Sequence, residues 1–225
     1  MGSGREIGAV LFDLDGTLVD SAPDLVGALA WLREQHGLEP IPYQSLRHHA
    51  SRGALGLIQV GFADQPDLSR EELRGAFLAR YAEYLWHQSH PFEGIESALA
   101  RLHADGMKLG VVTNKPSGLA EPLIAKAGWS DVFGCVVGGN STPRPKPDPA
   151  PVLEACRRLG VHPCNAIMIG DDFRDIEAGR RAACATAVAA WGYVPPEEDP
   201  LNWQADHVLQ HPRDIFNISL SNNEL

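Results

Sequence analysis

Short apolar runs separated by helix-length segments constrain the fold of this 225-residue chain more than any other feature of its sequence. The runs show little polar alternation, which is typical of strands that are buried on both faces of a sheet. Strands joined by helices in this order pair in parallel, and the helices cover both faces. The predicted strands are residues 7–12, 108–112, 132–137, 166–169 and 186–190, and the predicted helices are residues 93–104, 117–127, 149–159 and 174–181. The sequence therefore predicts an α/β fold with a mostly parallel sheet.

The segment from residue 24 to residue 88 departs from this alternation. Leu25, Leu29 and Leu32 recur at helical spacing, and Ser69 with Glu72 forms a capping pattern at the start of a helix. We expect at least three helices and no strand in this segment.

A helical unit inserted after the first strand explains this departure. The predicted division is a core formed by residues 1–20 and 91–225, and a smaller domain formed by residues 21–90. Within the insert, the aromatic residues Phe77, Tyr81 and Tyr84 are interpreted as the buried face of a helix.

Polar side chains follow the predicted strands at the points where these strands end. Because ligands of parallel sheets bind beyond the carboxyl ends of the strands, we expect these side chains to meet at one edge. They are Asp13 and Asp15 after the first strand, Thr113, Asn114 and Lys115 after the second, Asp171 and Asp172 after residues 166–169, and Arg144 and Lys146 in the loop STPRPKPDP.

The carboxylates in this set require a positive partner. Asp13 and Asp15 project to the same side of an extended segment, and Asp171 arrives from another strand. Two like charges about 4 Å apart repel by roughly 4 kcal/mol at an effective dielectric of 20. Oxygen ligands without clustered His or Cys favour a hard cation, so the sequence predicts a Mg²⁺ site.

The stretches DLDGT, VVTNK, RPKPDP and GDDFRD resemble the four motifs of the haloacid dehalogenase superfamily, in the order of that family and over nearly the whole chain. The insert resembles the C1-type caps of phosphoglycolate phosphatase-like members. Residues 191–212 are similar to a branch that includes N-acetylmuramic acid 6-phosphate phosphatases. The resemblance implies a Rossmann-like core with a smaller inserted α-helical cap domain. It also implies Mg²⁺-dependent hydrolysis of a small phosphomonoester, either 2-phosphoglycolate or N-acetylmuramic acid 6-phosphate.

The same resemblance implies the roles of individual residues. Asp13 would be the nucleophile that forms an aspartyl-phosphate, and Asp15 would be the general acid and base. Mg²⁺ would be held by Asp13, by the backbone carbonyl of Asp15 and by Asp171. Thr113 and Asn114 would bind the phosphoryl oxygens, and Lys146 would neutralise negative charge.

Other candidate residues surround this set. Asp172 and Asp175 are expected behind the metal ligands, where Asp175 would orient metal-bound water. In the cap, Ser51 and Arg52 are expected to contact the substrate. For Arg174 and Lys115 the sequence leaves two alternatives open, phosphate-facing groups or solvated surface charges.

Other functions of the same fold remain as alternatives. Dehalogenases and phosphonatases of the superfamily lack the second aspartate, which is present here as Asp15, and the insert contains no lysine for a phosphonatase. A sugar phosphomutase and a non-catalytic phosphometabolite-binding module are both compatible with the fold. The module would be expected to lack Asp13, Asp15 or Lys146, and all three are present.

Composition restricts the partners. The formal net charge of −10 disfavours nucleic acid, and no apolar stretch approaches the roughly 20 residues of a membrane span. Four scattered cysteines and the lack of a signal-peptide pattern predict a cytoplasmic protein. The expected partner is a small phosphorylated molecule, and the chain is expected to be a monomer or a homodimer.

Overall fold

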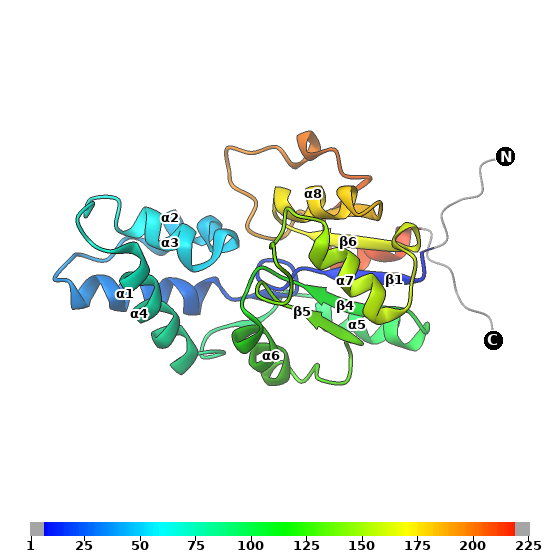
Figure 1. Cartoon of the computed structure of the whole chain (residues 1–225), viewed down its shortest axis with the longest axis horizontal. Helices are drawn as coiled ribbons and strands as arrows, with labels where there is room; N and C mark the ends of the chain where they lie inside the picture. The colour runs from blue at the N-terminus through cyan, green and yellow to red at the C-terminus, as the bar shows by residue number, and fades with distance from the viewer. Residues whose placement is uncertain (1–6, 219–225) are drawn as a thin grey trace.

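The computed structural model describes residues 7–218, and its larger part is built on a six-stranded sheet (Figure 1). The strand order is β5-β4-β1-β6-β7-β8, and every neighbouring pair is parallel. The strands are β1 (Ala9–Phe12), β4 (Lys108–Val112), β5 (Cys135–Val137), β6 (Ala166–Gly170), β7 (Ala185–Ala189) and β8 (His207–Leu209). The predicted α/β class with a Rossmann-like parallel sheet is confirmed.

Helices cover both faces of the sheet. On one face Val10 and Phe12 of β1 share an apolar cluster with residues of α5 (Ile95–Ala104) and α6 (Ser117–Lys126). On the other face Ala9 and Leu11 pack with residues of α7 (Ala150–Leu159) and α8 (Phe173–Arg181). Alternate side chains of a strand point to opposite faces, so a run that is apolar at every position is buried on both.

The observed strands differ from the predicted ones at several places, and β6 and β7 differ by one residue only, with β6 ending at Gly170 and β7 spanning Ala185–Ala189. β1 begins at Ala9 instead of residue 7, and β5 contains only Cys135–Val137 because residues 132–134 belong to a turn. The sequence also missed β8, which lies at the edge of the sheet beside β7. β8 has only three residues and follows a long polar connection, so its sequence is too short to show the alternation of polar and apolar residues that marks a strand.

The chain from residue 22 to residue 83, called here the helical segment, lies to one side of the sheet (Figure 1). Its helices are α1 (Ala22–Gln35), α2 (Tyr43–Leu46), the 3₁₀ turn η1 (Arg47–Arg52), α3 (Gly53–Gly61) and α4 (Arg70–Glu83). Leu25, Leu29 and Leu32 are buried, and the Ser69 hydroxyl accepts the Glu72 N–H at 3.3 Å. The expectation of at least three helices is confirmed. The division into two domains at residues 21 and 90 stays a prediction.

A pair of short antiparallel strands lies where the chain enters and leaves the helical segment. β2 (Val19–Asp20) pairs with β3 (His90–Pro91). Next to them the buried carboxylate of Asp24 accepts the backbone N–H groups of residues 87, 88 and 89 and the Ser89 hydroxyl, at 2.6–3.0 Å. These bonds fasten the first turn of α1 to the returning chain.

Within residues 7–218, every helix is too short or too polar to cross a bilayer.

Candidate active site

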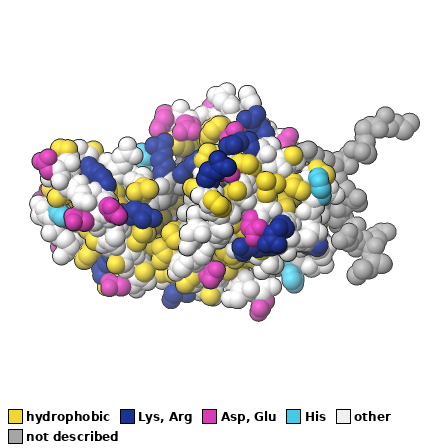
Figure 2. All heavy atoms as spheres, viewed as in Figure 1, with side chains coloured by type: hydrophobic (Ala, Val, Ile, Leu, Met, Phe, Trp, Pro, Cys, Tyr) yellow, Lys and Arg dark blue, Asp and Glu magenta, His cyan; other side chains and the backbone are white. Residues whose placement is uncertain are grey.

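A cavity of about 370 Å³ lies between the polar edge of the sheet and the helical segment. Figure 2 shows Lys and Arg side chains across the centre of this view, although the chain as a whole carries a net charge of −10. The cavity is lined by Asp13, Asp15, Thr113, Asn114, Lys115, Lys146, Asp172, Arg174 and Asp175 of the sheet part, and by Ser51, Arg52, Arg74 and Tyr81 of the helical segment, among others. Nearly all the residues predicted for the site are therefore brought to one place.

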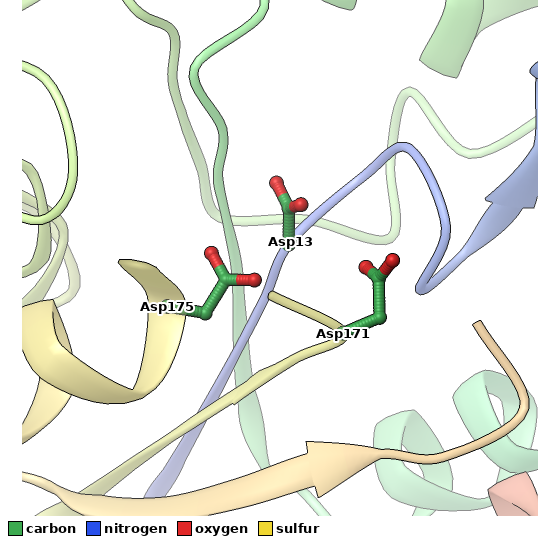
Figure 3. Close-up of side chains that lie close together, drawn as sticks. All are labelled: Asp13, Asp171 and Asp175. Atoms are coloured by element: carbon green, nitrogen blue, oxygen red, sulfur yellow. The ribbon is translucent and has the colours of Figure 1, made fainter. Parts of the chain in front are cut away.

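Three carboxylates converge at this edge of the sheet, as Figure 3 shows. Asp13 follows β1, Asp171 follows β6 and Asp175 lies in the first turn of α8. One oxygen of each lies within 4.8 Å of the other two. Because the donors are all oxygen and nearly all buried, this cluster fits a hard divalent cation.

Asp171 is held from two directions. The Thr17 hydroxyl donates to its Oδ1 at 2.7 Å, and the Tyr193 N–H donates to its Oδ2 at 3.0 Å. Gly16 packs directly against the carboxylate and has a φ of +88°. A Cβ at Gly16 would lie 2.1 Å from Asp171 Oδ2, so only glycine fits this position.

The substitution Gly16→Ala is expected to weaken both the fold and metal binding. Alanine at positive φ costs about 1–3 kcal/mol of folding free energy, and the added methyl group also displaces the Asp171 carboxylate. Gly27→Ala is the matched control, since a Cβ there meets nothing within 4 Å. Urea denaturation and calorimetric titration with Mg²⁺ check the prediction. Unchanged Mg²⁺ affinity in Gly16→Ala would contradict it.

Lys146 supplies the positive charge of the cluster. Its side chain is buried, and Nζ lies 2.8 Å from Asp13 Oδ1, 2.6 Å from Asp175 Oδ1 and 2.6 Å from the carbonyl oxygen of Val112. The ammonium group therefore has a partner for each of its three donors.

Asn114 positions the loop that carries Lys146. The Asn114 side-chain amide donates to the Lys146 carbonyl at 2.9 Å, and its oxygen accepts the Lys146 N–H at 2.9 Å. Because the side-chain amide is engaged in this way, binding of phosphate at Asn114 would use the backbone N–H. The Thr113 hydroxyl, which is buried beside it, accepts the Lys115 N–H at 3.1 Å.

The pKa values of Asp171 and Asp175 are raised because these carboxylates are buried close to other acidic side chains. Burial raises the pKa of Asp171 well above its usual range, and the charges of Asp13 and Asp175 add to this effect. Burial also raises the pKa of Asp175 to about 7, because Lys146 offsets only part of the increase. For Lys146, burial alone would lower the pKa, but the carboxylates of Asp13 and Asp175 outweigh burial and raise it.

These shifts predict that stability falls as the pH rises and that Mg²⁺ opposes this fall. The folded state holds protons on Asp171 and Asp175 more tightly than the unfolded chain does, so their protonation favours folding at low pH. For Asp175 this contribution is lost as the pH rises to about 7. Mg²⁺ binds the ionised carboxylates, so its stabilising effect should grow over the same range.

Melting temperatures with Mg²⁺ and with EDTA, at about pH 5.5 and about pH 8, check this dependence. We expect a larger Mg²⁺-induced increase in Tm at the higher pH. An equal increase at both pH values would contradict the prediction.

Asp15 is not one of these three carboxylates, and its side chain contacts Lys115 instead. Lys115 Nζ donates to Asp15 Oδ1 at 2.9 Å and to Oδ2 at 3.0 Å, and the Ser21 hydroxyl donates to Oδ1 at 2.5 Å. Lys115 also donates to the hydroxyl of Tyr81 on α4 at 3.0 Å. Lys115 is only 8% exposed, so the alternative of a solvated surface charge was wrong.

Asp172 and Arg174 form a separate pair. The Arg174 guanidinium donates to both carboxylate oxygens of Asp172, and a third contact runs to the Ser51 carbonyl at 2.8 Å. Although burial alone would raise the pKa of Asp172, Arg174 lowers it. Asp172 is the N-cap of α8 and completes a capping box with Asp175. The carboxylate of Asp172 thus caps a helix, whereas that of Asp175 belongs to the cluster of three carboxylates that could bind a metal ion.

Two of the residues around the site escaped sequence reasoning. Tyr81 was interpreted as helix core, and it is buried, but its hydroxyl also contacts Lys115. Tyr193 was not singled out, yet its N–H holds Asp171 and its hydroxyl contacts Asp20 and the Ala22 N–H at 2.8 Å. Tyr84 was interpreted as part of the same apolar face as Tyr81 but is 43% exposed.

Comparison with known proteins defines the class of this fold and site. The model of the haloacid dehalogenase-like hydrolase family matches residues 7–183. The chain belongs to this family, as the four motifs predicted.

The relatives narrow the class further. The chain is 42% identical to the N-acetylmuramic acid 6-phosphate phosphatase of Pseudomonas aeruginosa, with 93% of each chain covered. It is 40% identical to a phosphoglycolate phosphatase of Xanthomonas campestris pv. campestris, with 92% of this chain and 94% of the relative covered. A crystal structure of a predicted phosphoglycolate phosphatase from Haemophilus somnus superposes with a TM-score of 0.86 at 27% identity, covering 95% and 98% of the two chains. The prediction of a phosphoric monoester hydrolase is confirmed.

Proposed function

We propose that this phosphatase hydrolyses a small phosphomonoester with Mg²⁺ and through an aspartyl-phosphate on Asp13. The observation that carries the proposal is the buried Lys146 ammonium between Asp13 and Asp175, with Asp171 completing the carboxylate cluster at one end of the cavity. A nucleophilic carboxylate can approach a phosphate dianion only where positive charge offsets their repulsion.

Asp13, the backbone carbonyl of Asp15 and Asp171 would hold Mg²⁺, and the proximity of Asp175 supports a fourth contribution, direct or through water. When bound, Mg²⁺ supplies charge neutralisation at the phosphoryl group. Asp172 would act only indirectly, through the start of α8.

The chain's own residues divide the reaction between them. Asp13 attacks the phosphorus, and Asp15 gives a proton to the leaving oxygen and later takes one from the attacking water. The Thr113 hydroxyl and the Asn114 N–H bind phosphoryl oxygens. Lys146 holds Asp13 in place and offsets the charge of the phosphate.

We propose that residues 21–90 act as a cap that closes over the cavity and selects the substrate. Ser51 and Arg52 line the cavity from this side, which supports their predicted contact with the substrate. Arg52 lies 3.8 Å from Glu198 and is otherwise half exposed, so its guanidinium is available to an anionic group. 2-Phosphoglycolate and N-acetylmuramic acid 6-phosphate are the two candidate substrates, because relatives at 40% and 42% identity carry these names.

The test is a comparison of kcat/KM for 2-phosphoglycolate, N-acetylmuramic acid 6-phosphate and hexose 6-phosphates, with Mg²⁺ and with EDTA. We expect Mg²⁺-dependent release of inorganic phosphate and a preference for one of the first two. Interconversion of sugar phosphates without release of phosphate would indicate the phosphomutase alternative. Binding of all three without turnover would indicate a non-catalytic module. The cytoplasmic location and the choice between monomer and homodimer stay predictions.

A further inference from the structure

Lys115 has no role in the reaction proposed above, yet its ammonium group is buried and fully engaged. Its three donors face three acceptors, Asp15 Oδ1 at 2.9 Å, Asp15 Oδ2 at 3.0 Å and the Tyr81 hydroxyl at 3.0 Å. Tyr81 is 1% exposed, so this contact is shielded from water. A buried charge with this geometry is costly to disturb.

The contact joins three separate parts of the chain. Asp15 follows β1, Lys115 follows β4, and Tyr81 lies on α4 of the helical segment. Ser21, the N-cap residue directly before the helical segment, adds a bond to Asp15 Oδ1. Both oxygens of Asp15 therefore have hydrogen-bond donors. One of these donors, Lys115, also contacts Tyr81, so its position depends on where α4 lies.

The electrostatics support a stable ion pair. Burial alone would lower the pKa of Lys115, but Asp15 and Tyr81 outweigh it and raise the pKa. Burial raises the pKa of Tyr81 to about 12, so the hydroxyl stays neutral and accepts from the ammonium group. Lys115 is thus a charged donor between a carboxylate and a phenol.

We propose that Lys115 is the positioning residue for Asp15, and that Tyr81 completes this arrangement only when α4 lies against the edge of the sheet. Closure of the helical segment would then assemble the proton-transfer group together with the closed cavity. This inference rests on the proposed function, because it assumes that Asp15 transfers protons.

The two chemical steps differ in their need for Asp15. In the first step Asp13 attacks phosphorus, the bond from phosphorus to the leaving oxygen breaks, and that oxygen takes the proton carried by Asp15, which is left as the carboxylate that Lys115 contacts. In the second step water attacks phosphorus and gives its proton to the Asp15 carboxylate. The bond from phosphorus to Asp13 then breaks, and inorganic phosphate leaves. p-Nitrophenolate is a stable anion and leaves without a proton, so with p-nitrophenyl phosphate only the second step needs Asp15 in position.

Stopped-flow release of p-nitrophenolate by the Mg²⁺-loaded full chain therefore tests the proposal. In Lys115→Met we expect the first turnover to stay within about threefold of wild type, while the steady-state rate that follows falls roughly 10- to 100-fold. Tyr81→Phe, which removes only the hydroxyl, should show the same pattern with a decrease of about 3- to 10-fold. For an alkyl phosphate such as a hexose 6-phosphate, both steps should slow.

Matched controls use the same substitutions at exposed sites. Lys126→Met lies in the last turn of α6, and Tyr84→Phe lies one turn after Tyr81, so neither should change either rate. Thermal unfolding shows whether each variant is folded. If Lys115→Met does not fold, Tyr81→Phe and Lys115→Arg decide the outcome.

The failure of this inference differs from the failure of the proposed function. Equal loss of the first turnover and of the steady-state rate would place Lys115 in phosphate binding and overturn the inference. Unchanged rates in folded Lys115→Met and Tyr81→Phe would also overturn it, with phosphatase activity intact. A wild-type chain that releases no p-nitrophenolate would instead overturn the proposed function.

Discussion

Asp13→Asn is expected to lose at least about 10³-fold in kcat while the fold is retained. The amide has the shape of the carboxylate but is not a nucleophile, so no aspartyl-phosphate can form. The substitution also removes one of three crowded carboxyl groups, and the Lys146 ammonium keeps its contact with Asp175. We therefore expect the free energy of unfolding to change by no more than about 1 kcal/mol.

Phosphate release and urea denaturation measure the two halves of this prediction. Asp131→Asn is the matched control, because Asp131 is exposed and lies outside the cavity lining. Turnover by Asp13→Asn at a rate near that of the wild type would exclude Asp13 as the nucleophile. Loss of cooperative unfolding would show that Asp13 is needed for the fold instead.

Lys146→Met is expected to impair both activity and stability. Removal of the ammonium group leaves the carboxylates of Asp13 and Asp175 facing each other without a partner, and breaking a buried ion pair costs about 3–5 kcal/mol. The carbonyl of Val112 also loses its donor. Without the ammonium group beside the attacking oxygen, kcat/KM should fall by about 10²- to 10³-fold.

The matched control for this variant is Lys126→Met, which is expected to match the wild type. In EDTA the stability loss of Lys146→Met should be large, and Mg²⁺ should restore part of it by supplying a positive charge at the same carboxylates. Urea denaturation with and without Mg²⁺ measures both effects. A stability close to that of the wild type in EDTA would show that the carboxylates need no neutralisation by Lys146.

Local signals in the sequence account for the strands that carry the site. β1 and β6 are short apolar runs, and β4 is apolar after its first residue, Lys108. Each is followed at once by polar residues, so the edge where Asp13, Thr113 and Asp171 meet was predictable. β8 was not predictable, because three residues at a sheet edge are held by pairing with β7 and not by a pattern of their own.

The choice between Asp172 and Asp175 required the structure. Both acidic residues follow β6, and the sequence placed both behind the metal ligands. The turn into α8 directs Asp172 onto Arg174 and onto its own helix terminus, whereas Asp175 in the first turn faces Asp13 and Asp171. The directions of these two side chains depend on the backbone angles of the turn, which the residue types alone do not fix.

The parallel sheet and the edge where Asp13 and Asp171 meet follow from the sequence alone, because apolar runs and the residues adjoining them are local features. The burial of Lys115 against Asp15 and Tyr81, and the link that Tyr193 makes between Asp171 and the start of α1, became apparent only from the folded chain. These contacts depend on how the helical segment packs on the sheet. That packing is set by the shapes of surfaces far apart in the chain and not by any pattern along it.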